Sequence, residues 1–162
     1  MDLWTNDDRR AVVTETVERI ADGTRSMTDP RVVSLAPSAT ATVAALGAAD
    51  LLVGVTQHCD PPADAGGAHG ADPPAPIGGW LNPDLDRVDA LDPDVVLTSD
   101  ALQADLAADC RDRGFDVAHR EPATVDDAVA GFAARGADVG RPEAGERLAA
   151  DARDRLDRIA AA

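Results

Sequence analysis

The residues of this sequence that could do chemistry lie in three short groups. Ser38 follows Pro37, the run His58-Cys59-Asp60 precedes two prolines, and Trp80 follows a Gly-Gly pair. A serine or cysteine close to a histidine can act as a nucleophile, and histidine, cysteine and aspartate can all bind metal ions. A tryptophan at the tip of a turn can instead lie flat against the ring of a large ligand.

The residues that suggest a nucleophile or a metal site can each be explained more simply by a structural role. Only His58 could serve Ser38 as a base, and a role as helix N-cap explains Ser38 better. Three adjacent residues cannot enclose a metal ion by themselves, while His69 falls in a glycine-rich loop and His119 at the exposed end of a strand. The sequence therefore predicts no metal site made of protein ligands alone. An enzyme with Cys59 as nucleophile beside His58 stays open as an alternative.

Trp80 belongs to a stretch, residues 76–99, whose pattern is turn, short helix, turn and buried strand. Asn82 and Pro83 predict the start of the helix, with Asn82 as N-cap and Pro83 at the first helical position. Residues 95–97 form a continuous apolar run, which is typical of a strand covered on both faces. This arrangement places Trp80 at the rim of a sheet. We interpret it as a platform for a ligand ring, with capping of the sheet edge as the structural alternative.

Strands and helices alternate along the rest of the chain. Apolar runs predict strands at residues 32–35, 51–55, 95–97 and 115–118, and periodic or capped segments predict helices at 7–22, 38–46, 83–91, 99–113, 124–132 and from 142 onward. This alternation predicts an α/β fold with a Rossmann-like parallel sheet, flanked by helices and joined by right-handed crossovers. The domains expected are a helical extension at 1–26, whose true start is Met1 or Met27, a lobe at 27–140, and a long helix at 141–162.

The carboxyl ends of parallel strands share one edge of the sheet, and ligands bind beyond that edge in such folds. The expected ends fall at residues 37–38, 58–60, 79–80, 99–100 and 121–122. The candidate ligand-binding residues are therefore Pro37, Ser38, Cys59, Asp60, Trp80, Leu81 and Ser99.

Composition narrows the classes of function. The net charge is −15, with 30 acidic against 15 basic residues, and every basic residue is arginine. The acidic residues are spread along the chain, which favours a salt-adapted, halophilic surface over an acidic patch for a basic partner. Nucleic-acid binding is disfavoured, because it needs a basic surface that this composition does not provide.

The sequence gives little indication of a membrane span or an export signal, and its two cysteines indicate neither a metal site nor a disulfide. No apolar run is long enough to span a membrane, and the N-terminus has no basic and apolar segments of an export signal, so a cytoplasmic location is open. Cys59 and Cys110 show no metal-finger or disulfide spacing, and Cys110 falls on the apolar face of a helix, where we expect it in the core.

Three segments together, RVVSLAPSAT, LLVGVTQHCDPP and PIGGWLNPDLDRVDALDPDVVLTSD, resemble the class III, helical-backbone substrate-binding proteins of ABC importers. The resemblance covers residues 31–160 and implies the amino-terminal lobe plus the start, at 141–162, of the helix that joins two lobes, with the carboxyl-terminal lobe absent. The Trp80 segment is most similar to the branch that binds vitamin B12, in which a tryptophan packs against the ligand. The resemblance also implies an extracytoplasmic location and assigns Asp86 to docking on arginines of an ABC permease.

The sequence departs from the family in two places near the expected site. Ala41 stands where the family usually has glutamate, and no aromatic residue separates Asp60 from Pro61. The function expected is capture of a corrinoid (cobalamin or cobinamide) or a similar metal chelate, without catalysis, for ABC import. Haem and ferric siderophores stay open as ligands, as does the oligomeric state. A partial lobe that makes only protein contacts is the remaining alternative.

Overall fold

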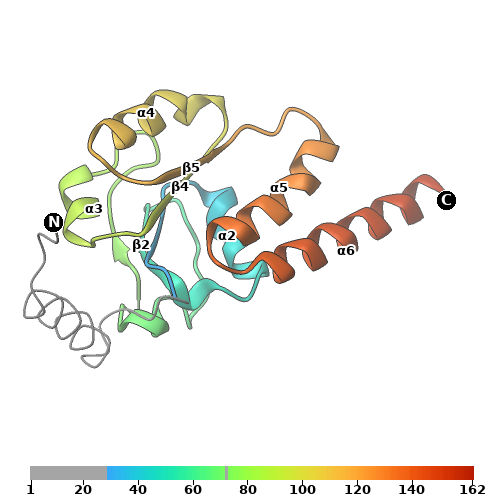
Figure 1. Cartoon of the computed structure of the whole chain (residues 1–162), viewed down its shortest axis with the longest axis horizontal. Coiled ribbons are helices and arrows are strands. Elements are labelled where there is room, and N and C mark those ends of the chain that lie inside the picture. Colours follow the sequence, from blue (N-terminus) through green and yellow to red (C-terminus); the bar gives the residue numbers. More distant parts are fainter. Residues whose placement is uncertain (1–28, 72) are drawn as a thin grey trace, which may run out of the picture.

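The structure is a computed structural model that describes residues 29–162 apart from residue 72. The predicted helix at 7–22 and the choice between Met1 and Met27 as the start lie outside these residues. The described chain forms a five-stranded parallel sheet with helices on both faces (Figure 1). The predicted α/β fold class is confirmed.

All the pairings between neighbouring strands are parallel, and the strand order is β3-β2-β1-β4-β5. The strands are β1 (Val32–Ser34), β2 (Leu52–Val55), β3 (Ala75–Pro76), β4 (Val95–Ser99) and β5 (Val117–Arg120). β3 was not predicted, because a two-residue edge strand that includes a proline carries no alternation to detect. β5 begins two residues later than predicted, because the amide of Phe115 still bonds to the carbonyl of Cys110 (3.1 Å) and closes the preceding helix before the strand can begin.

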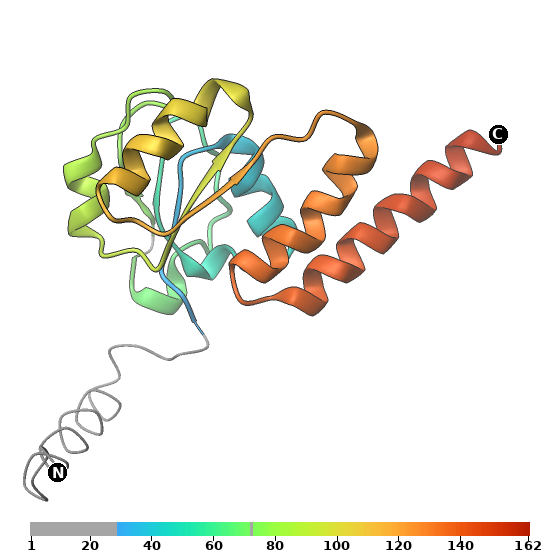
Figure 2. The ribbon, with the colours of Figure 1, turned by 45° about the horizontal axis from the view of Figure 1, so that its top comes forward.

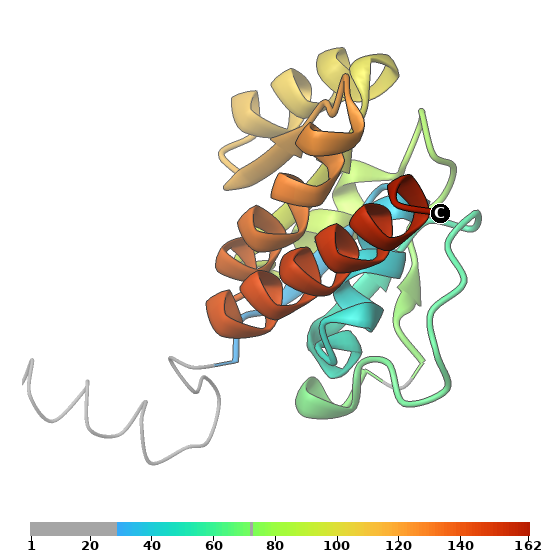
Figure 3. The same cartoon turned by 90° about the vertical axis from the view of Figure 1, so that its right-hand side faces the viewer.

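In the part of the chain that the structure describes, three α-helices and three short 3-10 helices connect the strands, and two further α-helices follow β5. The α-helices are α2 (Pro37–Ala45), α3 (Leu85–Ala90), α4 (Ala104–Asp112), α5 (Val125–Asp138) and α6 (Pro142–Ala160), and the 3-10 helices are η1 (Ala49–Leu51), η2 (Gly67–His69) and η3 (Ala101–Gln103). α3 and α4 cover one face of the sheet, while α2 and α5 cover the other and α6 lies along α5 (Figure 3). No helix among residues 29–162, residue 72 aside, is long and apolar enough to cross a membrane.

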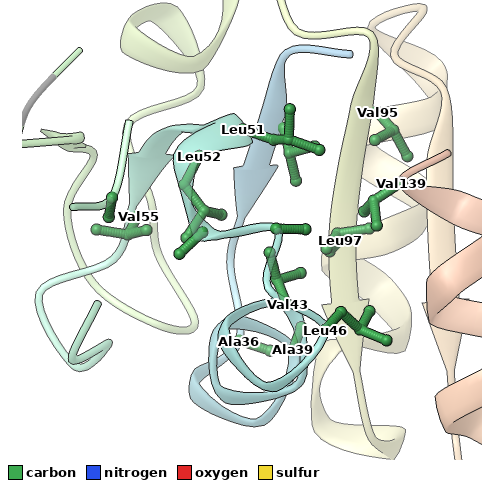
Figure 4. Packing of buried hydrophobic residues seen from close by; sticks show 14 residues of the cluster. Ala36, Ala39, Val43, Leu46, Leu51, Leu52, Val55, Val95, Leu97 and Val139 are labelled. Carbon is green, nitrogen blue, oxygen red and sulfur yellow. The ribbon is translucent and has the colours of Figure 1, made fainter. Parts of the chain in front are cut away.

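The core has two layers because side chains of a strand alternate between the faces of the sheet. On β4, Val95 and Leu97 join Val43 of α2 in one cluster (Figure 4), whereas Val96 joins Cys110 of α4 in the other. Burying each such valine or leucine side chain contributes about 1.5–3 kcal/mol. Cys110 is fully buried, as predicted, and this burial raises the pKa of its thiol.

Two helices begin at other residues than the sequence suggested. The N-cap of α2 is Ala36, with Pro37 at the first helical position, so the predicted N-cap role of Ser38 is wrong. Proline prefers that first position because it lacks an N–H and has a helical φ. The N-cap of α3 is Asp84, whose carboxylate accepts from two backbone amides at 3.1 and 3.2 Å. The prediction of Asn82 as the N-cap is therefore wrong.

The helix predicted at 99–113 also differs in the structure, where its first part is the 3-10 helix η3 and the α-helix α4 begins only at Ala104. Asp100 caps η3 through a bond from the amide of Leu102 (2.8 Å), and this 3-10 turn changes the helical phase before α4 begins. As a result Leu102 is 69% exposed, and Gln103 takes the buried position with Leu106. The helix predicted from residue 124 is α5, which begins with a capping box: the Thr124 hydroxyl accepts from the Asp127 amide, and the Asp127 carboxylate accepts from the Thr124 amide, both at 3.1 Å.

α5 and α6 form an antiparallel pair whose backbones nearly touch. A Cβ atom on Gly136 would lie 2.6 Å from the Cα of Gly145, and one on Gly145 would lie 2.7 Å from the carbonyl oxygen of Phe132. Only glycine fits both positions. Beyond this crossing α6 leaves the body of the lobe (Figure 2), and Leu156 and Ile159 on its outer half are exposed.

Candidate ligand-binding site

A hollow of about 430 Å³ lies beyond the carboxyl ends of the strands. We call it the Trp80 hollow, and it is lined by Ala36, Pro37, Ser38, His58, Trp80 and Asp100. These residues follow four different strands, β1 to β4, so the parallel topology alone explains why they meet. The sequence-based placement of a concave site at this edge agrees with the geometry.

The loop that carries Trp80 is a turn held in place by backbone pairing. Gly78 has φ +100° and pairs with Pro83 in an isolated antiparallel bridge, which places Trp80 between them. The carbonyl of Gly78 accepts from the amide of Gln57 at 3.0 Å, so the turn is tied to the chain that follows β2. Because this bridge takes up Pro83, α3 begins two residues later than predicted. The Trp80 side chain is half-buried and contributes to the wall of the hollow.

Gln103 holds this edge of the site together, and the sequence analysis missed it. The side chain is fully buried, and its Nε2 donates to the carbonyls of Trp80 and Leu35, both at 2.8 Å. Its Oε1 accepts from the amide of Ser99 at 2.9 Å. One amide side chain thus joins the Trp80 turn to the ends of β1 and β4. A glutamine three residues after the expected end of a strand was the only sign in the sequence.

The other predicted site residues are distributed around the hollow rather than in it. Leu81 is 51% exposed beside Trp80, and Asp60 is exposed, but neither lines the hollow. The half-buried thiol of Cys59 lies 3.2 Å from the hydroxyl of Thr56 and packs against the core. Among the described residues this thiol makes no hydrogen bond to His58, so the geometry does not form the nucleophile–base pair that the enzyme alternative needs.

A second hollow, also of about 430 Å³, lies between α2, α5 and the ends of β4 and β5. We call it the Arg135 hollow; its lining includes Ser38, Ser99, Arg120, Glu121, Phe132 and Arg135. Arg135 is 4% exposed, and its guanidinium donates to the carbonyls of Ala118 (2.7 Å) and Thr98 and to the hydroxyl of Ser99 (2.9 Å). The predicted ligand-binding residue Ser99 is therefore buried and bonded to the protein itself.

Charge in the Arg135 hollow is balanced internally. Asp138 bonds to Arg120 at 2.7 Å and lies 3.7 Å from Arg135. Burial lowers the pKa of Arg135 to about 10, which the charge of Asp138 partly opposes. The arginine is therefore still a cation at neutral pH, and its bonds to backbone carbonyls offset part of the desolvation of the charge.

His119 also differs from expectation. Its side chain is only 13% exposed, and its Nδ1 and Nε2 lie 2.7 Å from the hydroxyl of Thr98 and 2.8 Å from the carboxylate of Glu121. The expected exposed surface histidine is thus a structural one. Both nitrogens are used because β5 runs beside β4 and brings Thr98 opposite His119.

Comparison with known proteins identifies the family. A family model described as periplasmic binding protein matches residues 32–162, which is well over half of the chain. The chain belongs to the periplasmic binding protein family. A search of curated protein sequences returns no significant match.

Solved structures of other periplasmic binding proteins share the fold. The periplasmic vitamin B12-binding protein BtuF of Vibrio cholerae is 26% identical, with a TM-score of 0.63 over 80% of this chain and 49% of that chain. An ABC transporter substrate-binding protein of Listeria monocytogenes (23% identity, TM-score 0.66, 81% and 48%) and the periplasmic heme-binding protein HutB of Vibrio cholerae (18%, 0.67, 82% and 50%) show the fold alone. The chain spans about half the length of each of these proteins.

Asp86, the predicted docking residue, lies on α3 of this periplasmic binding protein lobe. Its side chain is 86% exposed, and its carboxylate bonds to a nitrogen of Arg113 at 2.6 Å. This hydrogen bond raises the pKa of Arg113. A carboxylate that docks on another protein's arginine would have to exchange this internal partner.

Proposed function

We propose that this chain is a ligand-binding lobe that captures a metal chelate, of the corrinoid type, for import by an ABC transporter. The observation that carries the proposal is Trp80, held on an anchored turn so that its indole forms a wall of the hollow at the carboxyl edge of the sheet. A flat apolar ring at a concave site is suited to packing against a large planar ligand.

Two further observations support a corrinoid rather than an unspecified ligand. The similar structure at 26% identity is a vitamin B12-binding protein, and the match covers 80% of this chain. The Trp80 hollow is also lined mostly by uncharged groups, with Asp100 as its one carboxylate. A ligand that is bulky and mostly uncharged at its periphery suits such a wall better than a polyanion does.

The same proposal places the protein outside the cytoplasmic membrane, in line with its family, with Asp86 as the contact to a permease. It also includes a surface adapted to high salt. At a net charge of −15 the folded chain repels itself, and salt at about 1 M shortens the range of that repulsion to about 3 Å. The free energy of unfolding should therefore rise as KCl is raised from low to molar concentration.

A titration with cyanocobalamin and with dicyanocobinamide, in molar KCl, tests the proposal. Replacing Trp4 by phenylalanine leaves Trp80 as the only tryptophan, so quenching of its fluorescence reports ligand at the hollow. We expect saturable quenching by at least one of these corrinoids, and thermal stabilisation of the lobe that grows with ligand concentration.

The matched control is Leu81→Ala, which removes an exposed apolar side chain next to Trp80 but outside the hollow. It should bind as the parent protein does. A lobe that is folded in molar salt but shows neither quenching nor stabilisation by any corrinoid at high micromolar concentration would contradict the proposal and favour a lobe that makes only protein contacts.

A further inference from the structure

We infer that His58 coordinates the metal of the captured chelate, so that the preferred ligand is a planar metal chelate with an exchangeable axial position. This inference rests on the proposed function, because it names the class of ligand for the same hollow. It assigns a role to a residue that the sequence analysis considered only as a catalytic base or as part of a metal site made of protein ligands.

The first step is that His58 is the histidine left free to bind a ligand. Across residues 29–162, residue 72 excepted, its ring makes no hydrogen bond and no ion pair, and the residue is exposed. His69, by contrast, lies 3.0 Å from a backbone carbonyl oxygen, and both ring nitrogens of His119 have partners within 2.8 Å. Structural roles therefore account for two of the three histidines and not for His58.

The second step is position. His58 and Trp80 line the same hollow, although they follow different strands, β2 and β3. One supplies a nitrogen lone pair and the other a flat apolar surface, and a planar metal chelate needs both kinds of contact. The neighbouring thiol of Cys59 does not compete for the metal, because it already bonds to Thr56 and packs against the core.

The third step concerns the number of protein ligands. No group of three or more histidine, cysteine, aspartate or glutamate residues that could hold a metal ion occurs in the described part of the chain. A bare ion needs about three or four protein ligands, so one imidazole cannot retain it. A macrocyclic chelate brings its own equatorial donors and leaves only axial positions open, and a single histidine suffices for one of those.

The coordination step is a simple ligand exchange. The lone pair of an imidazole nitrogen forms a bond to the metal as the metal–water bond breaks, and the water leaves to solvent. The metal keeps its oxidation state, so no electron donor or acceptor is needed. The imidazole must be neutral to donate its lone pair, and the displaced water leaves as a neutral molecule, so the exchange transfers no proton.

The test uses chelates with open and with blocked axial positions. Aquacobinamide and ferric haem each have an exchangeable axial position, whereas dicyanocobinamide has the corrin ring of the first with both positions occupied by cyanide. We expect the full chain to shift the visible absorption bands of aquacobinamide, and those of ferric haem, toward those of an imidazole complex. It should bind dicyanocobinamide without any such shift.

Variants separate coordination from binding. His58→Ala should abolish the spectral shift and weaken binding of the open chelate by at least about tenfold, or about 1.4 kcal/mol, while binding of dicyanocobinamide stays unchanged. His69→Ala, which removes a histidine outside the hollow, should leave both spectra and affinities as in the parent chain.

The outcomes distinguish this inference from the proposed function. Binding of dicyanocobinamide together with identical spectra for the parent and His58→Ala would overturn the role of His58 and leave corrinoid capture intact. Failure to bind any of the three chelates would overturn both.

Discussion

The two hollows at the carboxyl edge of the sheet have the same volume, about 430 Å³, and share Ser38, yet their side chains are used differently. In the Arg135 hollow the guanidinium bonds to two backbone carbonyls and a hydroxyl of the protein itself. In the Trp80 hollow the loop is held through the backbone carbonyl of Trp80, while the indole makes no hydrogen bond in the described part of the chain.

This difference separates folding from binding. A side chain already bonded inside the lobe can contact a ligand only by giving up bonds that stabilise the fold. A side chain held through its backbone can meet a ligand without that loss. Substitutions in the Arg135 hollow should therefore change stability, and substitutions in the Trp80 hollow should change affinity.

The largest effect is expected for Arg135→Met. It removes a buried cation and leaves the carbonyls of Thr98 and Ala118 without their donor, so the free energy of unfolding should fall by about 3–5 kcal/mol. Urea denaturation in molar KCl measures this. Arg120→Met is the matched control, because its partly exposed pair with Asp138 should contribute under about 1 kcal/mol. Equal losses in the two variants would refute a special role for Arg135.

Gln103→Met should affect both the stability of the lobe and the order of the Trp80 turn. The variant keeps the size of the side chain but leaves two carbonyls and one amide unpaired, at a cost of about 2–4 kcal/mol in all. The Trp80 turn should also become more mobile, seen as lower fluorescence anisotropy with Trp4 replaced by phenylalanine. The exposed Gln57→Met should change neither measurement. Unchanged anisotropy in Gln103→Met would show that the turn does not depend on this residue.

Trp80→Ala should show most clearly that ligand affinity and folding stability depend on different residues. Loss of a ring that packs against the ligand should weaken corrinoid binding by about 2 kcal/mol, or roughly thirtyfold. The half-buried ring contributes less to the core, so the unfolding free energy should change by less than the binding energy does. Isothermal titration calorimetry and urea denaturation on the same samples measure both. A large loss of stability with unchanged affinity would reverse the proposed division.

Ser38→Ala should have the smallest effect, although Ser38 lines both hollows. Because Ala36 is the N-cap of α2, removing this exposed hydroxyl should change stability by less than about 0.5 kcal/mol. Asp84→Ala, which removes the true N-cap of α3, should lower it by about 1 kcal/mol. Thermal unfolding of the two variants side by side provides the comparison, and equal losses would restore the N-cap role to Ser38.

The sequence was sufficient for those parts of the structure that depend on local pattern. Apolar runs located four of the five strands, and the parallel topology then brought Pro37, Ser38, His58 and Trp80 to one edge. The family match agrees with the resemblance seen in the three segments. Whether the candidate residues bind a ligand is still a prediction.

The parts that could not be predicted depend on contacts between distant residues. Gln103 bonds to residues 68 and 23 positions away in the sequence, and Arg135 bonds across 37 and 17 positions. No local periodicity reports such bonds. The start of α3 was misplaced for a related reason, since the bridge from Gly78 to Pro83 overrides the local preference of an Asn-Pro pair for a helix N-terminus.

At the contact between Gly136 and Gly145 no side chain separates the backbones of α5 and α6, so this contact sets the direction of α6 and acts as the pivot for any tilt of the helix. From Gly145 to Ala160 the helix rises about 1.5 Å per residue, so a tilt of about 10° at the pivot would swing its tip by about 4 Å. A single methyl group added at either glycine would therefore be felt most strongly at the far end of the helix, well away from the atom that was changed.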